Sequence, residues 1–283
     1  MERLFLIPAL HPGRLQVHVV LAASFLVTGC ACGLVFHPDP WVRTTPASLG
    51  LAYEDVVLET DDGERLRGWW VPAGGAWGTV VFFHGNGGNM SSCLDAVETA
   101  HRLRLNIFLF DYRGYGRSTG TPTERGLFLD ADAACAHVLH ERGVSSGTVV
   151  LWGRSLGGAV AAYAASRYHV SVLVLESTFV SVPRLAEEHV GCLGRKLFLG
   201  CTFDTLGLLA KTRVPVLVVH SRDDEIVPFD HGRTLYDAAA HPKTFVEIQG
   251  SHNQGAVLSR AVFERELESF LNAHLPCDGK GGT

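Results

Sequence analysis

The feature that most restricts the fold of this chain is a regular alternation of short apolar runs with segments of helical spacing. Short, uniformly apolar strands between helices are typical of a parallel sheet covered on both faces. We therefore predict an α/β fold with right-handed crossovers. The predicted strands are 79–83, 106–110, 148–152, 170–175, 214–219 and 244–248, and the predicted helices are 91–103, 123–142, 156–167, 230–240 and 254–272.

An antiparallel hairpin is expected at one edge of this sheet, before the alternation begins. The apolar runs VVLET and RLRGWWVP flank the turn residues Asp61-Asp62-Gly63, a typical hairpin pattern. We expect Trp69 and Trp70 on this hairpin to pack in the core and along the edge. Ligands of such sheets bind at the carboxyl ends of the strands, so polar motifs at those ends are the candidates for function.

The N-terminus differs in kind from the rest of the chain. The stretch Leu15–Phe36 contains no Asp, Glu, Lys or Arg, and its roughly 22 residues are just enough to span a bilayer. Arg3 and Arg14 precede it, which favours a cytoplasmic N-terminus and an extracytoplasmic body. The proline-rich stretch HPDPWVRTTP follows at once and predicts a linker over 37–52, which disfavours the alternative of a buried core helix.

Within this stretch, Val27-Thr28-Gly29-Cys30 resembles a bacterial lipoprotein signal, whose cysteine becomes lipidated after cleavage. The apolar region Val17–Val27 before it has the length of a signal peptide. Residues 1–36 are thus predicted to be either a lipoprotein signal with Cys30 as the lipidated residue or an uncleaved anchor. Either way we expect a membrane-associated protein with its body on the extracytoplasmic side.

Composition restricts partners and cofactors. The formal charge of −5 and the absence of a Lys/Arg-rich run argue against nucleic acid as a partner. The seven cysteines form no CxxC pair and no Cys/His spacing suited to zinc, so no metal site is predicted. In an oxidising compartment Cys192 and Cys201 are candidates for a disulfide. Residues 276–283 are expected to be a disordered tail.

One motif of nucleophilic catalysis lies at a strand end. Gly153-Arg154-Ser155-Leu156-Gly157 fits G-x-S-x-G between a predicted strand and a predicted helix, the context that this motif requires. The letters alone are a weak signal, since they arise by chance in about one chain in ten of this length. The position of the motif between a predicted strand and a predicted helix is stronger evidence than its letters. We therefore take Ser155 as the candidate nucleophile. We expect Arg154 to be a surface or loop-bracing residue.

A serine nucleophile needs a base and an orienting acid, which in chains of this type follow it in the order acid, then histidine. His252 lies in the loop leaving the last strand and is the candidate base. The loop HSRDDEIVP after the preceding strand offers Asp223, Asp224 and Glu225. Without Ser155 and His252 elsewhere in the chain, we would interpret this acidic cluster as a solvated surface loop.

The loop 84–89 (HGNGGN) also follows a strand and is a candidate oxyanion hole. Its glycines allow the backbone to approach a ligand, so a free N–H can act together with that of Leu156. We assign Asn86 as this second donor, with Gly85 and Gly87 as alternatives, and expect His84 to brace the loop. The loop lacks GK[ST] and the spacing GxGxxG, which argues against phosphate binding.

The segment 111–118 (DYRGYGRS) lies on the same predicted rim. Its many polar side chains suggest catalysis, but we expect them to shape the site instead.

Together these motifs resemble the α/β-hydrolase superfamily. More narrowly, the chain resembles small, N-terminally anchored serine hydrolases described as serine aminopeptidase-like or α/β-hydrolase-domain proteins. The similarity covers nearly all of Phe36–Leu271, and implies a catalytic domain over 53–275 with a minimal lid. The acidic loop is similar to the family pattern HGxxDxxVP, with Ser221 in place of glycine, and this alignment makes Asp224 the acid rather than Asp223. The motifs are GLAYEDVVLETDDGERLRGWWVPA, HGNGGN, FDYRGYGRS, GRSLGG, RDDEIVP and GSHN.

The resemblance implies a membrane-tethered serine hydrolase acting on carboxylic esters or thioesters through an acyl-enzyme, with Ser155, His252 and Asp224 as its triad. No metal or organic cofactor is implied. Only 177–213 is available for a lid, which suits a shallow site for an acyl group protruding from a lipid or an acylated protein.

Two other functions remain open at this point. An aminopeptidase would need an acidic group to hold the substrate amine, and Glu176 or Glu187 are candidates. A non-catalytic binding protein on the same fold is the third possibility, against which the intact Ser, Asp and His argue.

Overall fold

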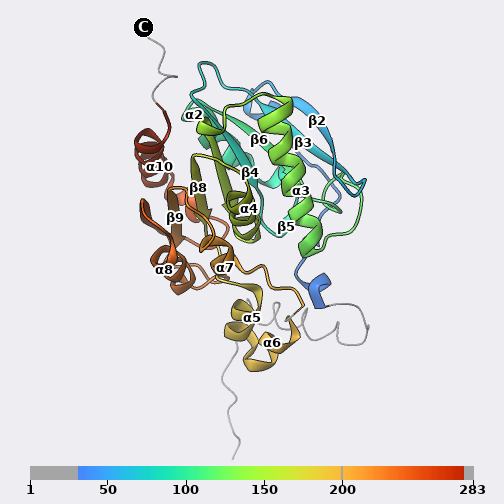
Figure 1. Ribbon diagram of the computed structural model, residues 1–283, viewed down its shortest axis with the longest axis vertical. Coiled ribbons are helices and arrows are strands. Elements are labelled where there is room, and N and C mark those ends of the chain that lie inside the picture. The colour runs from blue at the N-terminus through green and yellow to red at the C-terminus, as the bar shows by residue number, and fades with distance from the viewer. Residues whose placement is uncertain (1–30, 199, 277–283) are drawn as a thin grey trace, which may run out of the picture.

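The computed structural model describes residues 31–198 and 200–276 of the 283-residue chain. Its centre is an eight-stranded sheet with strand order β10-β9-β8-β7-β4-β6-β3-β2 (Figure 1). Only β3 runs against the other strands, pairing antiparallel with both β2 and β6. The strands are β2 (Glu54–Glu59), β3 (Arg65–Val71), β4 (Gly78–Phe83), β6 (Leu105–Asp111), β7 (Val149–Arg154), β8 (Val172–Glu176), β9 (Val216–Ser221) and β10 (Lys243–Ile248).

The predicted α/β fold with an edge hairpin is confirmed. Each predicted strand lies within two residues of an observed one, because a fully buried strand is apolar along its whole length. The helices agree less closely at their ends. The segment predicted as one helix over 123–142 is α3 (Glu124–Ala136) followed by a π-helical turn, and the last helix is divided into α9 (Gly255–Leu258) and α10 (Arg260–His274).

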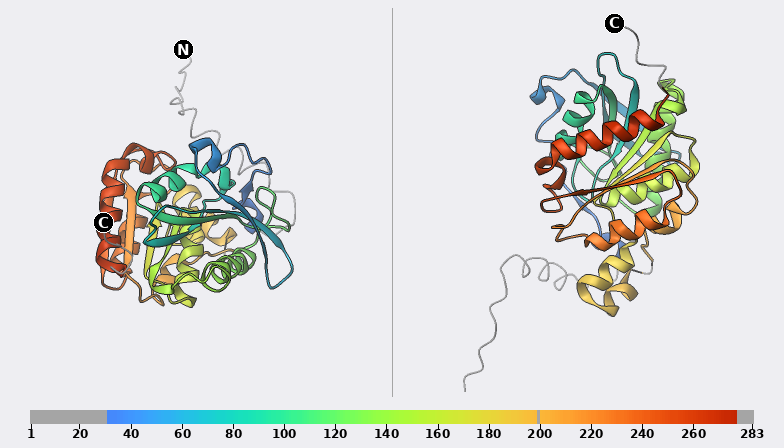
Figure 2. Two further views of the ribbon diagram at one scale, coloured as in Figure 1. Left: turned by 90° about the horizontal axis from the view of Figure 1, so that it is seen from above. Right: turned by 90° about the vertical axis from the view of Figure 1, so that its left-hand side faces the viewer.

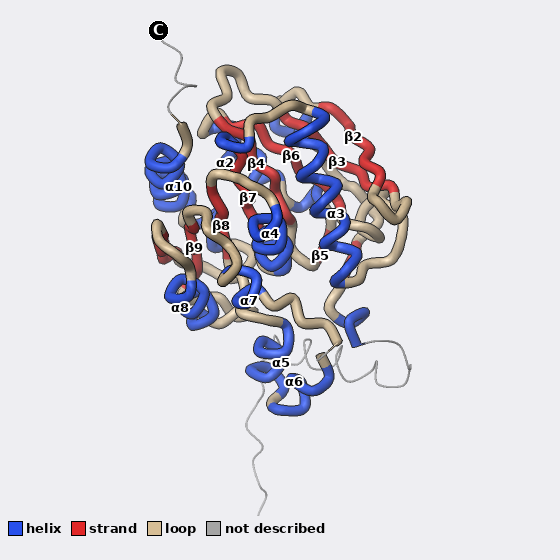
Figure 3. Tube along the Cα trace, viewed as in Figure 1, coloured by secondary structure: helices blue, strands red, loops and turns tan. Residues whose placement is uncertain are grey.

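Helices cover both faces of the sheet (Figures 2 and 3). Successive residues of each strand supply the two cores. On β4, Val81 and Phe83 pack on the face covered by α3, α4 (Leu156–Arg167) and α8 (Phe229–Ala238). Val80 and Phe82 pack on the opposite face against α2 (Leu94–Arg102) and α10. This alternation follows from the two-residue repeat of a strand.

The strand order places one crevice where loops can meet. The chain leaves β4 for β6 on one side and then crosses back to β7 on the other side of β4. At such a switch point the connections diverge to opposite faces and leave a crevice at the carboxyl ends of the strands. The loop 84–89 and Ser155 follow the two strands that border it.

The predicted linker lies along the body of the protein. In it, β1 (His37–Pro38) pairs in parallel with β5 (Gly87–Gly88), and Pro46–Leu49 forms a 3-10 turn. Just before it, the buried Phe36 ring packs edge-on against Phe203, with 6.0 Å between ring centroids. Residues 1–30, which include Cys30 and most of the predicted anchor, lie outside the described residues. Among 31–198 and 200–276 no helix is long and apolar enough to cross a membrane.

The described residues between β8 and β9 form a small cap of three short helices, in agreement with the minimal lid that the sequence predicted. These are α5 (Val182–Val190), α6 (Cys192–Leu197) and α7 (Thr205–Leu209). In Figure 1, α5 and α6 project from the lower end of the molecule. The cap is small, as the length of the segment predicted.

The candidate disulfide between Cys192 and Cys201 does not form. Cys192 begins α6 as an exposed free thiol, whereas Cys201 is fully buried and disulfide-bonded. Sequence proximity suggested the pair, but the start of a surface helix and the core below it place the two residues in different environments. Cys93 and Cys135 are buried, free thiols.

Candidate active site

Ser155 lies at a strained turn between β7 and α4. Its φ of 53° is in the left-handed region, which residues with a Cβ rarely occupy. Two backbone hydrogen bonds hold the turn: Ser155 N–H donates to Glu176 O at 2.8 Å, and Ser155 O accepts from Gly158 N–H at 2.9 Å. A Cβ at Gly157 would lie only 1.9 Å from Phe83 O. The helix can therefore start this close to β4 only with glycine at that position.

The structure brings the three predicted triad side chains together. His252 Nε2 lies 3.1 Å from Ser155 Oγ, and His252 Nδ1 lies 2.8 Å from Asp224 Oδ2. Both distances are within hydrogen-bond range, and the imidazole lies between hydroxyl and carboxylate. The Asp224 side chain is fully buried and that of His252 nearly so. This arrangement can pass a proton from the hydroxyl to the ring and stabilise the resulting imidazolium.

Each acidic residue of the loop after β9 has a different partner. Asp224 Oδ1 accepts from the backbone N–H groups of Ile226 and Val227, which fixes the carboxylate while Oδ2 faces the ring. Asp223 Oδ2 accepts from Gly250 N–H, and Glu225 Oε2 accepts from His252 N–H. Asp224 therefore contacts the imidazole, and its two neighbours hold the histidine loop by its backbone.

The loop 84–89 passes directly beside the nucleophile. A Cβ built on Gly85 would lie 3.6 Å from Ser155 Cβ. His84 Nδ1 donates to Gly85 O at 2.7 Å, and this orients the peptide that carries the Asn86 N–H. Leu156 is the first residue of α4, so its N–H has no partner within the helix. The assignment of these two N–H groups to an oxyanion stays a prediction.

The segment 111–118 supports this loop. Tyr112 Oη donates to His84 O at 3.0 Å, and Tyr115 Oη donates to Asn86 O at 2.8 Å. Arg113 is engaged elsewhere, by bidentate contacts to Asp62 and a contact to Asp130. These contacts agree with the expectation that the segment shapes the site rather than reacts.

The side chains of His84 and Asp111 are buried close together and have few hydrogen-bond partners. His84 Nε2 and Asp111 Oδ1 are 3.7 Å apart, and both side chains are almost fully buried. Burial lowers the pKa of His84 to about 4 and raises the pKa of Asp111 to about 7. The single hydrogen bond that Asp111 accepts from Met90 N–H only partly offsets its desolvation. The imidazole is therefore neutral at neutral pH.

Arg154 is part of a partly buried ion cluster beside the turn that carries Ser155. Its Nε donates to Glu176 Oε1 at 2.8 Å, and its Nη2 donates to Asp95 Oδ2 at 2.6 Å. Glu176 Oε2 also accepts from Trp152 Nε1 at 2.8 Å. Of the two roles expected for Arg154, loop bracing is therefore the one that the contacts support. Sequence reasoning found neither the role of Asp95 nor this role of Glu176, because nothing in their local sequence indicates a contact with Arg154.

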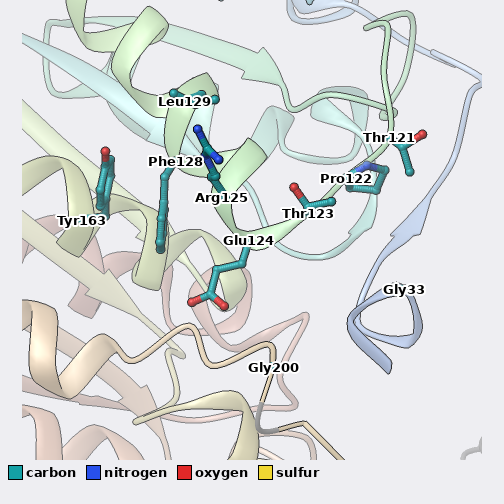
Figure 4. Close-up of a pocket in the computed structure, with 10 residues that line it drawn as sticks. All are labelled: Gly33, Thr121, Pro122, Thr123, Glu124, Arg125, Phe128, Leu129, Tyr163 and Gly200. Atoms are coloured by element: carbon teal, nitrogen blue, oxygen red, sulfur yellow. The ribbon is translucent and has the colours of Figure 1, made fainter. Parts of the chain in front are cut away.

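A separate surface cavity lies between α3 and the start of the described chain (Figure 4). Its lining includes Gly33, Phe128, Tyr163 and Gly200, and Phe128 and Tyr163 stack with 4.2 Å between ring centroids. No member of the triad lines it. The described residues contain no cluster of His, Cys, Asp and Glu that could hold a metal ion.

Comparison with known proteins identifies the family. Residues 78–193 match the family model described as the alpha/beta hydrolase fold. The chain is 34% identical over 263 residues to "Alpha/beta hydrolase domain-containing protein WAV2" of Arabidopsis thaliana, covering 84% of this chain and 85% of that protein. An uncharacterised membrane protein of Saccharomyces cerevisiae is 34% identical over 218 residues, covering 74% of this chain and 76% of that one. The chain belongs to the α/β-hydrolase family.

Solved structures agree with this fold. The Pyrococcus furiosus esterase Pf2001 superposes with a TM-score of 0.73 at 20% identity, covering 86% of this chain and 98% of that one. The esterase domain of a Rhodothermus marinus protein gives a TM-score of 0.61 at 19% identity, covering 80% and 100%. Family and fold together define a hydrolase.

Proposed function

We propose that this hydrolase is a serine hydrolase that cleaves carboxylic esters or thioesters through an acyl-enzyme. The observation that carries the proposal is the chain of contacts from Ser155 Oγ to His252 and from His252 to Asp224. A serine hydroxyl is a poor nucleophile at its own pKa and needs such a base.

In the first half-reaction His252 Nε2 removes the proton from Ser155 Oγ while that oxygen attacks the acyl carbon. Asp224 accepts the Nδ1–H of the ring and stabilises the imidazolium. The tetrahedral intermediate collapses when the same Nε2–H protonates the leaving oxygen or sulfur, which leaves the acyl group on Ser155. Water then attacks the acyl-enzyme with His252 again as base, and Ser155 is released.

The developing oxyanion is stabilised by the N–H groups of Leu156 and Asn86 in this proposal. His84 supports the second donor because its hydrogen bond to Gly85 O orients the peptide between Gly85 and Asn86. Loss of one such donor typically lowers kcat by ~10²–10³.

The contacts favour an ester or thioester over a peptide with a free amino terminus. An aminopeptidase needs a carboxylate to bind the substrate amine. The Glu176 carboxylate is almost fully buried and already binds Arg154 and Trp152. Glu187 is within 4 Å of Arg184 and Arg195, so both candidates for amine binding have cationic partners.

We also propose that residues 1–36 attach the enzyme to a membrane, with its body on the extracytoplasmic side. The uncharged stretch Leu15–Phe36 supports this attachment, as does the relative from Saccharomyces cerevisiae that is named a membrane protein. Acyl groups of lipids or of acylated proteins are then the substrates within reach.

Labelling with a fluorophosphonate tests the proposed nucleophile. We expect the wild-type protein to be labelled and Ser155→Ala to remain unlabelled, whereas Ser166→Ala on the same helix is labelled like the wild type. An ester series of increasing acyl length, run beside aminoacyl substrates, then defines the substrate class. Equal labelling of Ser155→Ala and wild type would refute the proposal and leave a non-catalytic protein.

A further inference from the structure

The exposed large apolar side chains of the described residues are concentrated on a few segments of the chain. Of the nine large apolar side chains that are more than a third exposed on the described surface, six are Trp41 of the 37–52 segment and residues of the cap, the acidic loop and α9. Leu193 (65% exposed) and Leu258 (68% exposed) are the most exposed of those on the cap and the histidine loop. The set is Trp41, Val190, Leu193, Ile226, Val257 and Leu258, which we call the apolar rim.

Contacts between these segments place the rim on one side of the molecule. His189 on α5 hydrogen-bonds Ile226 O at 2.7 Å, which joins the cap to the acidic loop. Glu225 and Asp223 in that loop bind the backbone of the histidine loop, which leads into α9 with Leu258. Asn89 of the loop after β4 donates to Trp41 O at 3.0 Å. The rim thus follows the loops that carry the proposed catalytic groups.

The described chain begins on this same side. Gly33 lines one cavity together with Gly200 of the cap segment, and Phe36 packs against Phe203 of that segment. The uncharged stretch Leu15–Phe36 therefore joins the body beside the cap. A segment that enters a bilayer and meets the protein here holds this side toward the bilayer surface.

We propose that the apolar rim docks on a lipid surface, so that acyl substrates reach Ser155 from the bilayer. The proposal rests on the proposed function and on the proposed insertion of the N-terminal stretch. Exposed Trp and Leu side chains around a site are suited to the boundary between head groups and acyl chains. The protein carries a formal charge of −5, so docking should depend on apolar burial and occur on zwitterionic lipid.

The free thiol of Cys192 beside Leu193 offers a direct test. The full chain is labelled with an environment-sensitive fluorophore and reconstituted into phosphatidylcholine vesicles, and Cys192→Ser identifies the signal of this position. We expect a blue shift in the vesicles and quenching by lipids with brominated acyl chains. The control is Val57→Cys in the Cys192→Ser background, because Val57 is also exposed but lies on edge strand β2. Water-like emission from both positions would overturn the proposal and favour a protein partner for the rim.

A second measurement separates docking from catalysis. Leu193→Asp places a charge in the rim at the first turn of α6, where an acidic residue is compatible with the helix. We expect its hydrolysis of a long-chain ester in vesicles to fall at least ~10-fold, because the rim loses apolar burial, and its hydrolysis of a soluble short-chain ester to be unchanged. Val57→Asp should change neither rate.

The outcomes distinguish the two proposals. If Leu193→Asp lowers both rates equally, or neither, the rim does not deliver the substrate. If the wild type hydrolyses neither ester, the proposed function fails, and the fluorophore at Cys192 still decides whether the rim meets lipid.

Discussion

At the scale of single residues, the proposed triad depends on how the Asp224 carboxylate is oriented toward the His252 ring. Asp224 has both oxygens engaged, one by two backbone N–H groups and one by the His252 ring. An amide in its place would keep the shape of the side chain but present a neutral group to the imidazole. The carboxylate is needed both to select the ring tautomer and to stabilise the imidazolium.

We therefore expect Asp224→Asn to lower kcat by ~10³–10⁴ with little change in the melting temperature. Steady-state ester hydrolysis and thermal unfolding of the same preparation measure the two quantities. Asp223→Asn is the matched control, since an amide oxygen can still accept from Gly250 N–H. A larger loss of activity in Asp223→Asn than in Asp224→Asn would contradict the assignment of the acid.

Asp111 gives a prediction about pH. Burial raises its pKa to about 7, above the value of about 3.8 expected in the unfolded chain. The folded state therefore retains the proton longer, so the contribution of this group to stability is full below pH 4 and is lost as pH rises toward 7. We expect Asp111→Asn to gain in free energy of unfolding relative to wild type, by a few kcal/mol, between pH 4.5 and 8.

Urea unfolding at a series of pH values measures this difference. The exposed Asp61→Asn is the control and should follow the wild-type curve. Parallel curves for Asp111→Asn and wild type would show that the Asp111 carboxyl titrates as it does in water.

At the scale of elements, the turn from β7 to α4 is held by an arginine of the sequence motif and by two carboxylates that lie outside the motif. Arg154 bridges Asp95 at the start of α2 and Glu176 at the end of β8. The same Glu176 accepts the Ser155 N–H through its backbone. The left-handed Ser155 is thus positioned from both its own strand and the neighbouring one.

We expect Arg154→Met to destabilise the fold by about 1–3 kcal/mol, because two carboxylates, of which Glu176 is buried, then lose their cationic partner. Chemical unfolding measures the loss, and Asp95→Asn/Glu176→Gln in the same background should recover part of it. Fluorophosphonate labelling of the folded variant should be slower than that of wild type, since the serine turn loses its support. If unfolding of Arg154→Met is unchanged, the cluster contributes nothing to the turn.

The sequence allowed the elements to be predicted better than their connections. Buried strands and the helix after Ser155 are recognisable because burial requires a continuous apolar run or a regular spacing. The pairing of His37–Pro38 with Gly87–Gly88 joins segments far apart in sequence and involves no apolar pattern. The third cap helix and the state of Cys192 depend likewise on tertiary packing rather than on local sequence.

In the candidate site, too, the residues placed by strand ends could be predicted, whereas the contacts made through tertiary packing could not. Ser155, His252 and Asp224 could be proposed because each lies after a predicted strand, and parallel strands bring their carboxyl ends to one edge. The choice between Asp223 and Asp224 required the family pattern, because adjacent residues of a loop differ only in orientation. The partners of Arg154 lie 22 and 59 positions away, and no local signal indicates them.

At the scale of the whole molecule, the sheet separates two cores. Val97 on α2 and Val160 on α4 are both fully buried, one on each face. Side chains on opposite faces share no partner, so their contributions to stability should be independent.

We expect Val97→Ala and Val160→Ala each to lower the free energy of unfolding by about 1–2 kcal/mol. The double variant should show the sum of the two losses within about 0.5 kcal/mol. Urea unfolding of the four proteins measures the coupling. A coupling well above that value would mean that the sheet transmits changes between its faces.

The ion cluster of Arg154, Asp95 and Glu176 also has a consequence for sequence variation within the family. When the arginine immediately before the nucleophile is replaced, two acids lose their counter-charge, whereas replacing one acid leaves the arginine paired with the other acid. Loss of the arginine at position 154 should therefore be tolerated only when positions 95 and 176 change with it. Among family members, we expect uncharged side chains at positions 95 and 176 wherever position 154 is not a basic residue.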